Sequence, residues 1–195
     1  MFKHLDFKFY KVDFIAIAVL VASLIWANVF AVDEILENTI YENIAIIPLF
    51  LGIVLCLRAK KYKTFFTFIA LILFLMIARE FNYGRVLFCQ LPDNRHDFYP
   101  WSHYKYGFLA HIIVGIYITA SCLWAVINKI WVDIIEIIKN IKFPFYTLSG
   151  CIFMTIAQIY CERFMHNTAF EEIAEFTLYC LLFSLVYIYT KKIIK

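Results

Sequence analysis

Residues 161–179, CERFMHNTAFEEIAEFTLY, place four carboxylates, an arginine and a histidine between two strongly apolar stretches. Glu172 and Glu175 lie three residues apart, so in a helix they share one face. His166 follows Glu162 by about one helical turn. Carboxylates and imidazoles held close together can donate or accept protons during a reaction, so this segment is a candidate site for general acid–base chemistry.

Carboxylates and imidazoles are also metal ligands, so a site for a divalent metal is a second interpretation of these residues. His111 and His166, with two further histidines at 96 and 103, accompany several carboxylates. However, Glu162 and His166 are four residues apart, whereas di-iron bundles use Glu-x-x-His, and the chain has no HExxH motif. A buried neutral imidazole bonded to a neighbouring helix is the structural alternative for His111. Cofactors therefore stay unassigned, with a divalent metal as the one candidate.

The elements that position these residues are predicted to be membrane spans. The chain is 64% hydrophobic and 17% charged, whereas soluble domains are about half apolar and a quarter charged. Apolar stretches near the roughly 20 residues that cross a bilayer occupy 14–32, 40–58, 64–83, 106–127, 144–162 and 169–190. Glu42, Asn43 and Pro48 interrupt the second, and Pro48 should kink it. We therefore expect an all-α fold, in which residues 1–195 form one polytopic bundle of six transmembrane helices.

Basic residues predict the orientation of this bundle. Cytoplasmic N and C termini would put thirteen of the eighteen lysines and arginines inside, as the positive-inside rule requires. Four of the five arginines fall outside, whereas twelve of the thirteen lysines fall inside. The net charge of +3 is small and scattered, so we expect no nucleic-acid partner.

Depth within the spans connects four of the ionisable groups. At about 1.5 Å per residue, Glu175 lies roughly 9 Å and His111 roughly 8 Å below the outer ends of their spans. Glu80 and Glu162 lie roughly 24–25 Å above the inner ends of theirs. Tyr179 continues the face of Glu175 deeper into the membrane. We take Glu80, Glu162, Glu175 and His111 as candidate catalytic residues, because ionisable groups inside spans indicate function by default. Ion pairs that tie helix ends together remain the structural alternative.

Arginine at the outer side favours a phosphate or carboxylate partner, because its planar guanidinium binds both with two parallel hydrogen bonds. The candidate substrate-binding residues are Arg79, Arg85, Arg163, Glu172 and His166. The expected partners are membrane lipid, a phosphate-bearing lipid, or a partner membrane protein.

Three connecting features carry further expectations. In 129–142, the polar residues fall at spacings of four, three and four, which predicts an amphipathic helix lying on the cytoplasmic membrane surface. A cytoplasmic extension of the fourth span is the alternative. The segment 89–105 contains two prolines and four aromatic residues and is predicted to fold as a cap on the outer leaflet. This cap either anchors the loop at the membrane surface or covers a site beneath it. Thr168 and Glu171 match a capping box at the start of the last span.

Two short stretches resemble signatures of small polytopic bacterial membrane proteins of unassigned function. These are residues 79–85, REFNYGR, which end the third span, and residues 171–175, EEIAE, which open the last. The resemblance covers about a tenth of the chain. It implies a six-span bundle in a bacterial inner membrane, and no activity comes with it.

Three functions fit these residues. In the first, an enzyme at the outer leaflet binds a phosphate-bearing lipid or lipid-linked substrate through its arginines and uses a glutamate as general acid or base, with His111 or His166 as the alternative proton shuttle. In the second, a non-catalytic binding or assembly subunit receives a partner helix at the polar layer. In the third, a small carrier couples transport to a cation or a proton. The sequence leaves open whether the chain is an enzyme.

Overall fold

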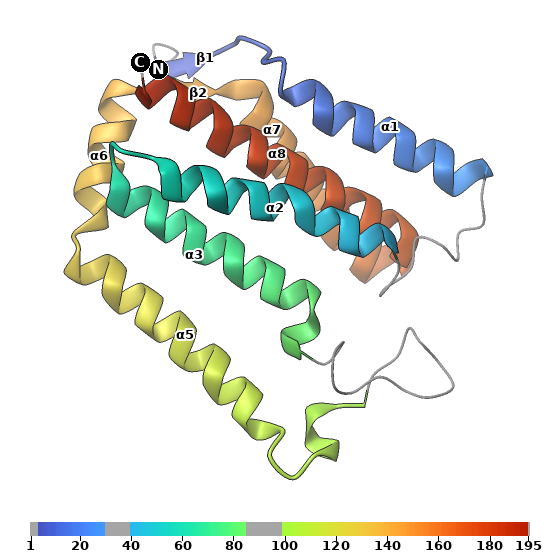
Figure 1. Cartoon of the computed structure of the whole chain (residues 1–195). Helices are drawn as coiled ribbons and strands as arrows, with labels where there is room; N and C mark the ends of the chain where they lie inside the picture. The colour runs from blue at the N-terminus through green and yellow to red at the C-terminus, as the bar shows by residue number, and fades with distance from the viewer. Residues whose placement is uncertain (1–3, 30–39, 85–98, 195) are drawn as a thin grey trace.

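The computed structural model describes residues 4–29, 40–84 and 99–194, and these fold into a helical bundle (Figure 1). Its α-helices are Asp13–Val29 (α1), Ile40–Arg58 (α2), Lys63–Glu80 (α3), Phe108–Ile127 (α5), Ile130–Asn140 (α6), Phe145–Tyr160 (α7) and Thr168–Ile194 (α8). The short elements are the strands Leu5–Asp6 (β1) and Phe143–Pro144 (β2), the 3-10 turns Asn82–Gly84 (η3) and Trp101–His103 (η4), and the π-helical turn Cys161–Met165 (η5). The predicted all-α class is confirmed, since each predicted span contains a helix.

Three of these helices are long and apolar enough to cross a membrane by length and composition alone. They are Tyr41–Arg58 in α2, Phe108–Ile127 in α5, and Thr168–Lys192 in α8. The helix α1 is also apolar but has 17 residues, and α7 has 16. Pro48 lies inside α2, which continues through it as one helix from Ile40 to Arg58.

The helix α8 lies at the centre of the bundle, and α1, α2 and α7 each pack against it (Figure 1). Several of its buried residues are small, among them Ala174, Thr177, Ser184 and Thr190, which lets neighbouring helices approach closely. The hydroxyls of Thr177 and Thr190 donate to carbonyls one turn earlier, at 2.8 and 2.9 Å. These buried hydroxyls are therefore satisfied within α8 itself.

The largest core cluster lies where α2 and α3 meet and reaches across to α8. It contains Leu49 and Cys56 from α2, Phe66 and Leu73 from α3, and Tyr179 from α8. The ring of Tyr179 belongs to this apolar core, whereas its hydroxyl meets charged groups. Although α2 packs against both helices, long side chains of α3 and α8 therefore meet at the level of the candidate site.

The polar stripe of α6 packs against the start of α3. Asp133 Oδ2 accepts the backbone N–H of Phe65 at 3.1 Å, which supplies a cap that the first turn of α3 lacks from its own residues. Tyr62 donates its hydroxyl to Glu136 Oε1 at 3.1 Å. Trp131, Val132, Ile135 and Ile138 of α6 are exposed, whereas Ile130 and Ile137 are buried. Part of the polar side of α6 is used for the tertiary contacts of Asp133 and Glu136.

The two ends of the chain meet at one end of the bundle (Figure 1). There β1 pairs in parallel with β2. Asp6 Oδ2 accepts one hydrogen bond from Lys192 Nζ at 2.8 Å and another from the Tyr10 hydroxyl at 2.5 Å. Burial by itself would raise the pKa of Asp6, but the hydrogen bonds from Lys192, Tyr10 and the Lys8 amide outweigh it and lower the pKa to about 2. Burial and the neighbouring Asp6 raise the pKa of Tyr10.

The predicted capping box at the start of α8 is wrong. Asn167 occupies the cap position, and its Oδ1 accepts the backbone N–H of Phe170 at 3.1 Å. Asn167 also accepts the amide of Glu171 through its carbonyl oxygen at 3.1 Å. Asn is as good an N-cap as Thr, so the helix begins at Thr168 with the residue before it as its cap.

The helix α5 packs only lightly on the rest of the described bundle (Figure 1). Tyr117 joins it to α3, because its hydroxyl donates to the carbonyl of Leu71 at 2.8 Å and its ring lies 5.8 Å from that of Phe74. Most of the apolar side chains of α5 are exposed. Such a surface on one helix needs either lipid or another protein to cover it.

Candidate functional site

Four polar side chains from two helices meet near one end of the bundle. Arg79 and Glu80 lie in the last turn of α3, and Glu175 and Tyr179 lie one turn apart on α8. Arg79 Nη2 lies 3.3 Å from Glu80 Oε1 and also forms an ion pair with Glu175 Oε1. Tyr179 Oη lies 2.6 Å from Glu80 Oε1 and 2.5 Å from Glu175 Oε1. We call these four residues the charged cluster.

Burial divides the charged cluster into an inner and an outer part. Glu80, Glu175 and Tyr179 retain 6%, 4% and 1% of their accessible surface, whereas the Arg79 side chain is 49% exposed. A buried carboxylate is costly unless it is paired and hydrogen-bonded, and both glutamates meet that condition. About half of the Arg79 side chain is therefore accessible from outside the bundle.

Local geometry explains why these residues meet. Glu175 and Tyr179 are four residues apart, so they lie on the same face of α8. Arg79 lies in the last turn of α3, where a cation interacts favourably with the helix dipole. After Glu80 the chain leaves the helix, since Asn82 and Tyr83 both have positive φ. The end of α3 is thus fixed beside the first turns of α8.

A hydrogen count shows what the cluster can do chemically. A tyrosine hydroxyl has one hydrogen and donates to one acceptor at a time. The Tyr179 oxygen lies within hydrogen-bond distance of two carboxylate oxygens, so both contacts are hydrogen bonds only if one carboxyl also carries a proton. With one such proton, Glu80, Glu175 and Arg79 sum to zero net charge. The geometry therefore suits a group that holds a proton and can pass it on.

Glu172 extends this polar region along α8. Its side chain is buried, and it lies close enough to Arg79, Tyr179 and Tyr41 to interact with them electrostatically. Glu42, at the start of α2, is buried as well. The end of the bundle where α2, α3 and α8 meet is therefore rich in buried carboxylates, and Arg79 forms ion pairs with two of them.

The other predicted site residues lie elsewhere. Glu162, Arg163 and His166 are exposed in and just after η5, and His111 is exposed on α5, so the buried imidazole considered for His111 is wrong. Arg85 lies outside the described residues. Two helices rather than four thus supply the charged cluster, because equal depth does not make side chains face the same way. The roles assigned to these residues stay predictions.

Among the described residues, no group of three or more His, Cys, Asp or Glu side chains is arranged to hold a metal ion. His103 stacks on Tyr99 with ring centroids 4.4 Å apart, in the described part of the predicted outer cap. The remainder of that cap, including His96, lies outside the described residues.

Two polar residues of the structure, Tyr179 and Asp13, lie outside the predicted site. Tyr179 was noted on the face of Glu175 but given no role, and its spacing of four residues was the available signal. Asp13 was missed altogether. It is 3% exposed at the start of α1, where its Oδ1 accepts the Thr147 hydroxyl at 2.9 Å and its Oδ2 accepts the Tyr10 amide at 3.0 Å. An acid directly before an apolar stretch is a helix-start signal.

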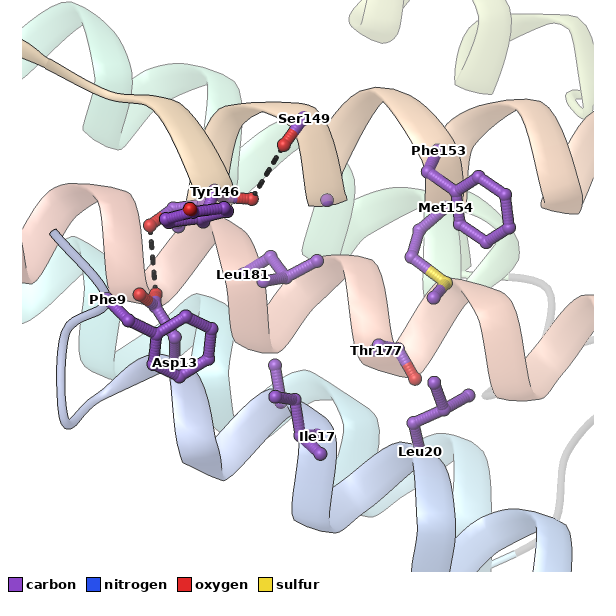
Figure 2. A pocket seen from close by; sticks show the side chains of 13 residues that line it. Phe9, Asp13, Ile17, Leu20, Tyr146, Ser149, Phe153, Met154, Thr177 and Leu181 are labelled. Atoms are coloured by element: carbon purple, nitrogen blue, oxygen red, sulfur yellow. Dashed lines mark hydrogen bonds between the residues drawn. The ribbon is translucent and has the colours of Figure 1, made fainter. Parts of the chain in front are cut away.

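Asp13 lies at one end of a cavity of about 390 Å³ (Figure 2). As Figure 2 shows, Ile17 and Leu20 of α1 lie on one side, Phe153 and Met154 of α7 lie on the other, and α8 runs between them. We call this cavity the lateral groove.

Comparisons of the chain with protein-family models, curated proteins and solved structures find no match. A function for this chain therefore rests on its own residues.

Proposed function

We propose that the chain is a six-span inner-membrane protein of bacterial type, whose charged cluster forms an acid–base site for a phosphate-bearing lipid at the outer leaflet. In this arrangement α1, α2, α3, α5, α7 and α8 cross the bilayer and α6 lies on the cytoplasmic surface. The observation that carries the proposal is a half-exposed Arg79 beside two buried carboxylates that converge on one tyrosine hydroxyl.

Exposed apolar surface supports the six spans. Three helices meet the length and composition of a span, and α1 and α7 lie alongside them in the same bundle (Figure 1). The large exposed side chains on α1 and α7 include Phe14, Ile25, Ile152 and Phe153. Since monomeric soluble proteins rarely expose apolar patches of this extent, lipid is the environment that such helices require.

The distribution of basic residues supports cytoplasmic termini. The N-terminal ends of α1, α3 and α7, the C-terminal ends of α2 and α8, and α6 all lie at the end of the bundle where the chain termini meet (Figure 1). Described lysines at these positions are Lys8, Lys11, Lys60, Lys61, Lys63, Lys129, Lys139, Lys142, Lys191 and Lys192. An excess of lysine marks the cytoplasmic side, so the charged cluster lies toward the outer side in the proposed orientation.

Labelling of introduced cysteines tests this topology. In a cysteine-free background, we expect Lys105→Cys to react with a membrane-impermeant maleimide added outside cells, and Lys61→Cys to react only after the membrane is opened. The reverse pattern, or equal labelling of both, would contradict the proposed orientation.

The proposed chemistry uses the half-exposed Arg79 for binding and the buried part of the charged cluster for proton transfer. The exposed guanidinium of Arg79 can form paired hydrogen bonds to a phosphate. A proton held among Glu80, Glu175 and Tyr179 lies next to that position, where one carboxyl can donate it as general acid and later take it back as general base. Arg85, Arg163 and His166 are the further candidates for phosphate binding at the same side.

Glutamine substitutions test the acid–base role. Glu80→Gln and Glu175→Gln remove the ionisable group but keep an oxygen that accepts the Tyr179 hydrogen, so the fold should persist. Lipids extracted from cells that express the wild-type chain should contain a modified phospholipid that disappears with either variant. Glu136→Gln, at an exposed glutamate of α6 outside the candidate site, should behave as wild type. If wild-type and Glu175→Gln extracts are identical while both proteins are folded, the enzymatic proposal is wrong.

A non-catalytic assembly subunit is the second candidate function, and the light packing of α5 favours it. An exposed helix face joined to the bundle mainly through Tyr117 suits a partner membrane protein. Co-purification of a stoichiometric partner that is lost when Ile113 and Ile116 are replaced by tryptophan would support this function. A proton-coupled carrier would use the same shared proton, but α2 continues through Pro48 and offers no broken helix of the kind carriers use.

A further inference from the structure

The lateral groove lies between α1 and α7, which share α8 as a partner and meet each other where Asp13 accepts the Thr147 hydroxyl. Both α1 and α7 pack against α8. Thr177 and Leu181 of α8 form the floor between them (Figure 2). These two residues lie about 200° around the helix from Glu175 and Tyr179, so the groove and the charged cluster occupy opposite faces of α8.

Most of the polar side chains that line the groove are already bonded within the protein. Asp13 accepts the Thr147 hydroxyl and the Tyr10 amide. Ser149 donates its hydroxyl to the Phe145 carbonyl at 2.8 Å, and Thr177 donates to a carbonyl within α8. The rest of the lining is almost wholly apolar. A ligand in this groove therefore gains from apolar burial rather than from hydrogen bonds.

The groove opens sideways between α1 and α7. Three of its lining residues, Phe9, Ile17 and Phe153, are also exposed, by 40%, 45% and 64%. If these helices cross a bilayer, this opening faces the hydrocarbon core rather than water. A volume of about 390 Å³ falls within the roughly 300–1,000 Å³ of small-molecule sites.

We propose that the lateral groove binds one acyl chain of an anionic phospholipid from the surrounding bilayer. The chain lies over Leu181 between Ile17 and Phe153, and the headgroup lies at the Asp13 end. Exposed Lys8 and Lys11 are at that end of α1 and complement an anionic headgroup. This site rests on the proposed membrane setting of α1, α7 and α8 and is independent of the chemistry of the charged cluster.

Filling the groove provides the test. Ile17→Trp enlarges a lining residue, whereas Ile15→Trp makes the same change at an equally exposed position of α1 outside the lining. The full chain is purified in mild detergent, incubated with phosphatidylglycerol or phosphatidylcholine, and analysed by native mass spectrometry. We expect one phosphatidylglycerol per wild-type chain. Losing the burial of two methylene groups weakens binding about tenfold, so Ile17→Trp should lower retention at least that much and Ile15→Trp should not.

The headgroup is tested with Lys8→Gln combined with Lys11→Gln, which should abolish the preference for phosphatidylglycerol over phosphatidylcholine. Equal retention by Ile17→Trp and Ile15→Trp, or no preference for the anionic lipid in the wild type, would overturn the proposal. Should Ile17→Trp fail to fold, Ser149→Leu fills the same groove from α7. Glu175→Gln should retain the lipid, so failure of the acid–base proposal and failure of the lipid site give different results.

Discussion

The hydroxyl of Tyr179 provides the most direct test of the charged cluster. Tyr179→Phe keeps the ring, which packs in the largest core cluster, and removes only the O–H group. No cavity forms, so the change in stability reports the lost hydrogen bond. The hydroxyl donates one hydrogen bond to a charged acceptor, and it accepts a second one when the other carboxyl carries the shared proton. Tyr179→Phe should therefore cost at least about 1.5–3 kcal/mol.

Tyr62→Phe is the matched control. Tyr62 is also buried and also donates its hydroxyl to a glutamate of another helix, at 3.1 Å. Its acceptor, Glu136, is exposed, so water can replace the lost bond and the cost should stay below about 1 kcal/mol.

Reversible unfolding in mixed micelles, titrated with a denaturing detergent and followed by circular dichroism, measures both variants. Tyr179→Phe should unfold at distinctly lower denaturant than Tyr62→Phe. A second measurement combines Tyr179→Phe with Glu80→Gln, and the two changes should be non-additive because they touch one network. Equal stabilities of Tyr179→Phe and Tyr62→Phe would refute the reasoning, since the buried carboxylates would then not depend on this hydroxyl.

Three further changes have clear expected outcomes. Asp133→Ala removes the cap on the amide of Phe65 and should cost about 0.5–2 kcal/mol in the same unfolding assay, whereas Asp133→Asn should cost less. Gly107→Ala would place a Cβ 1.7 Å from a backbone carbonyl oxygen and should expose this turn to proteases, whereas Gly115→Ala meets nothing within 4 Å and should be neutral or stabilising. The ionised Asp6 stabilises the fold above about pH 4, and this contribution should disappear as the pH falls toward 2, so Asp6→Asn should flatten the acid limb of the pH–stability curve.

Hydropathy predicted where the helices lie, because a span needs about 20 apolar residues and the chain supplies them in separate stretches. The second predicted span and α2 have the same bounds, 40–58. The third was predicted to reach residue 83 but ends at Glu80, since positive φ at Asn82 and Tyr83 is incompatible with a continuing helix. Hydropathy alone does not predict such positive-φ residues at a helix end.

The sequence does not predict which face of each apolar helix turns toward the core. In a helix that is apolar on every side, the 3.6-residue period does not indicate which face is buried. Depth alone therefore grouped Glu162 and His111 with Glu80 and Glu175, although the first two face outward. Glu175 carried one sequence signal that distinguished it, because Glu172 and Tyr179 lie on the same face of its helix.

Whether the charged cluster is kept for folding or for function can be decided by replacing it as a whole. Removing one member of a buried ion pair typically costs about 3–5 kcal/mol, whereas exchanging the complete set for apolar residues of similar volume is often neutral or stabilising. We expect Arg79→Met alone to reduce the folded yield strongly, because Glu80 and Glu175 would lose their cation. The combination of Arg79→Met, Glu80→Leu, Glu175→Leu and Tyr179→Phe should instead fold about as stably as wild type. If it folds but no longer yields the modified lipid, the cluster is retained for chemistry; if it fails to fold, the ion pairs hold α3 and α8 together and the acid–base proposal loses its basis.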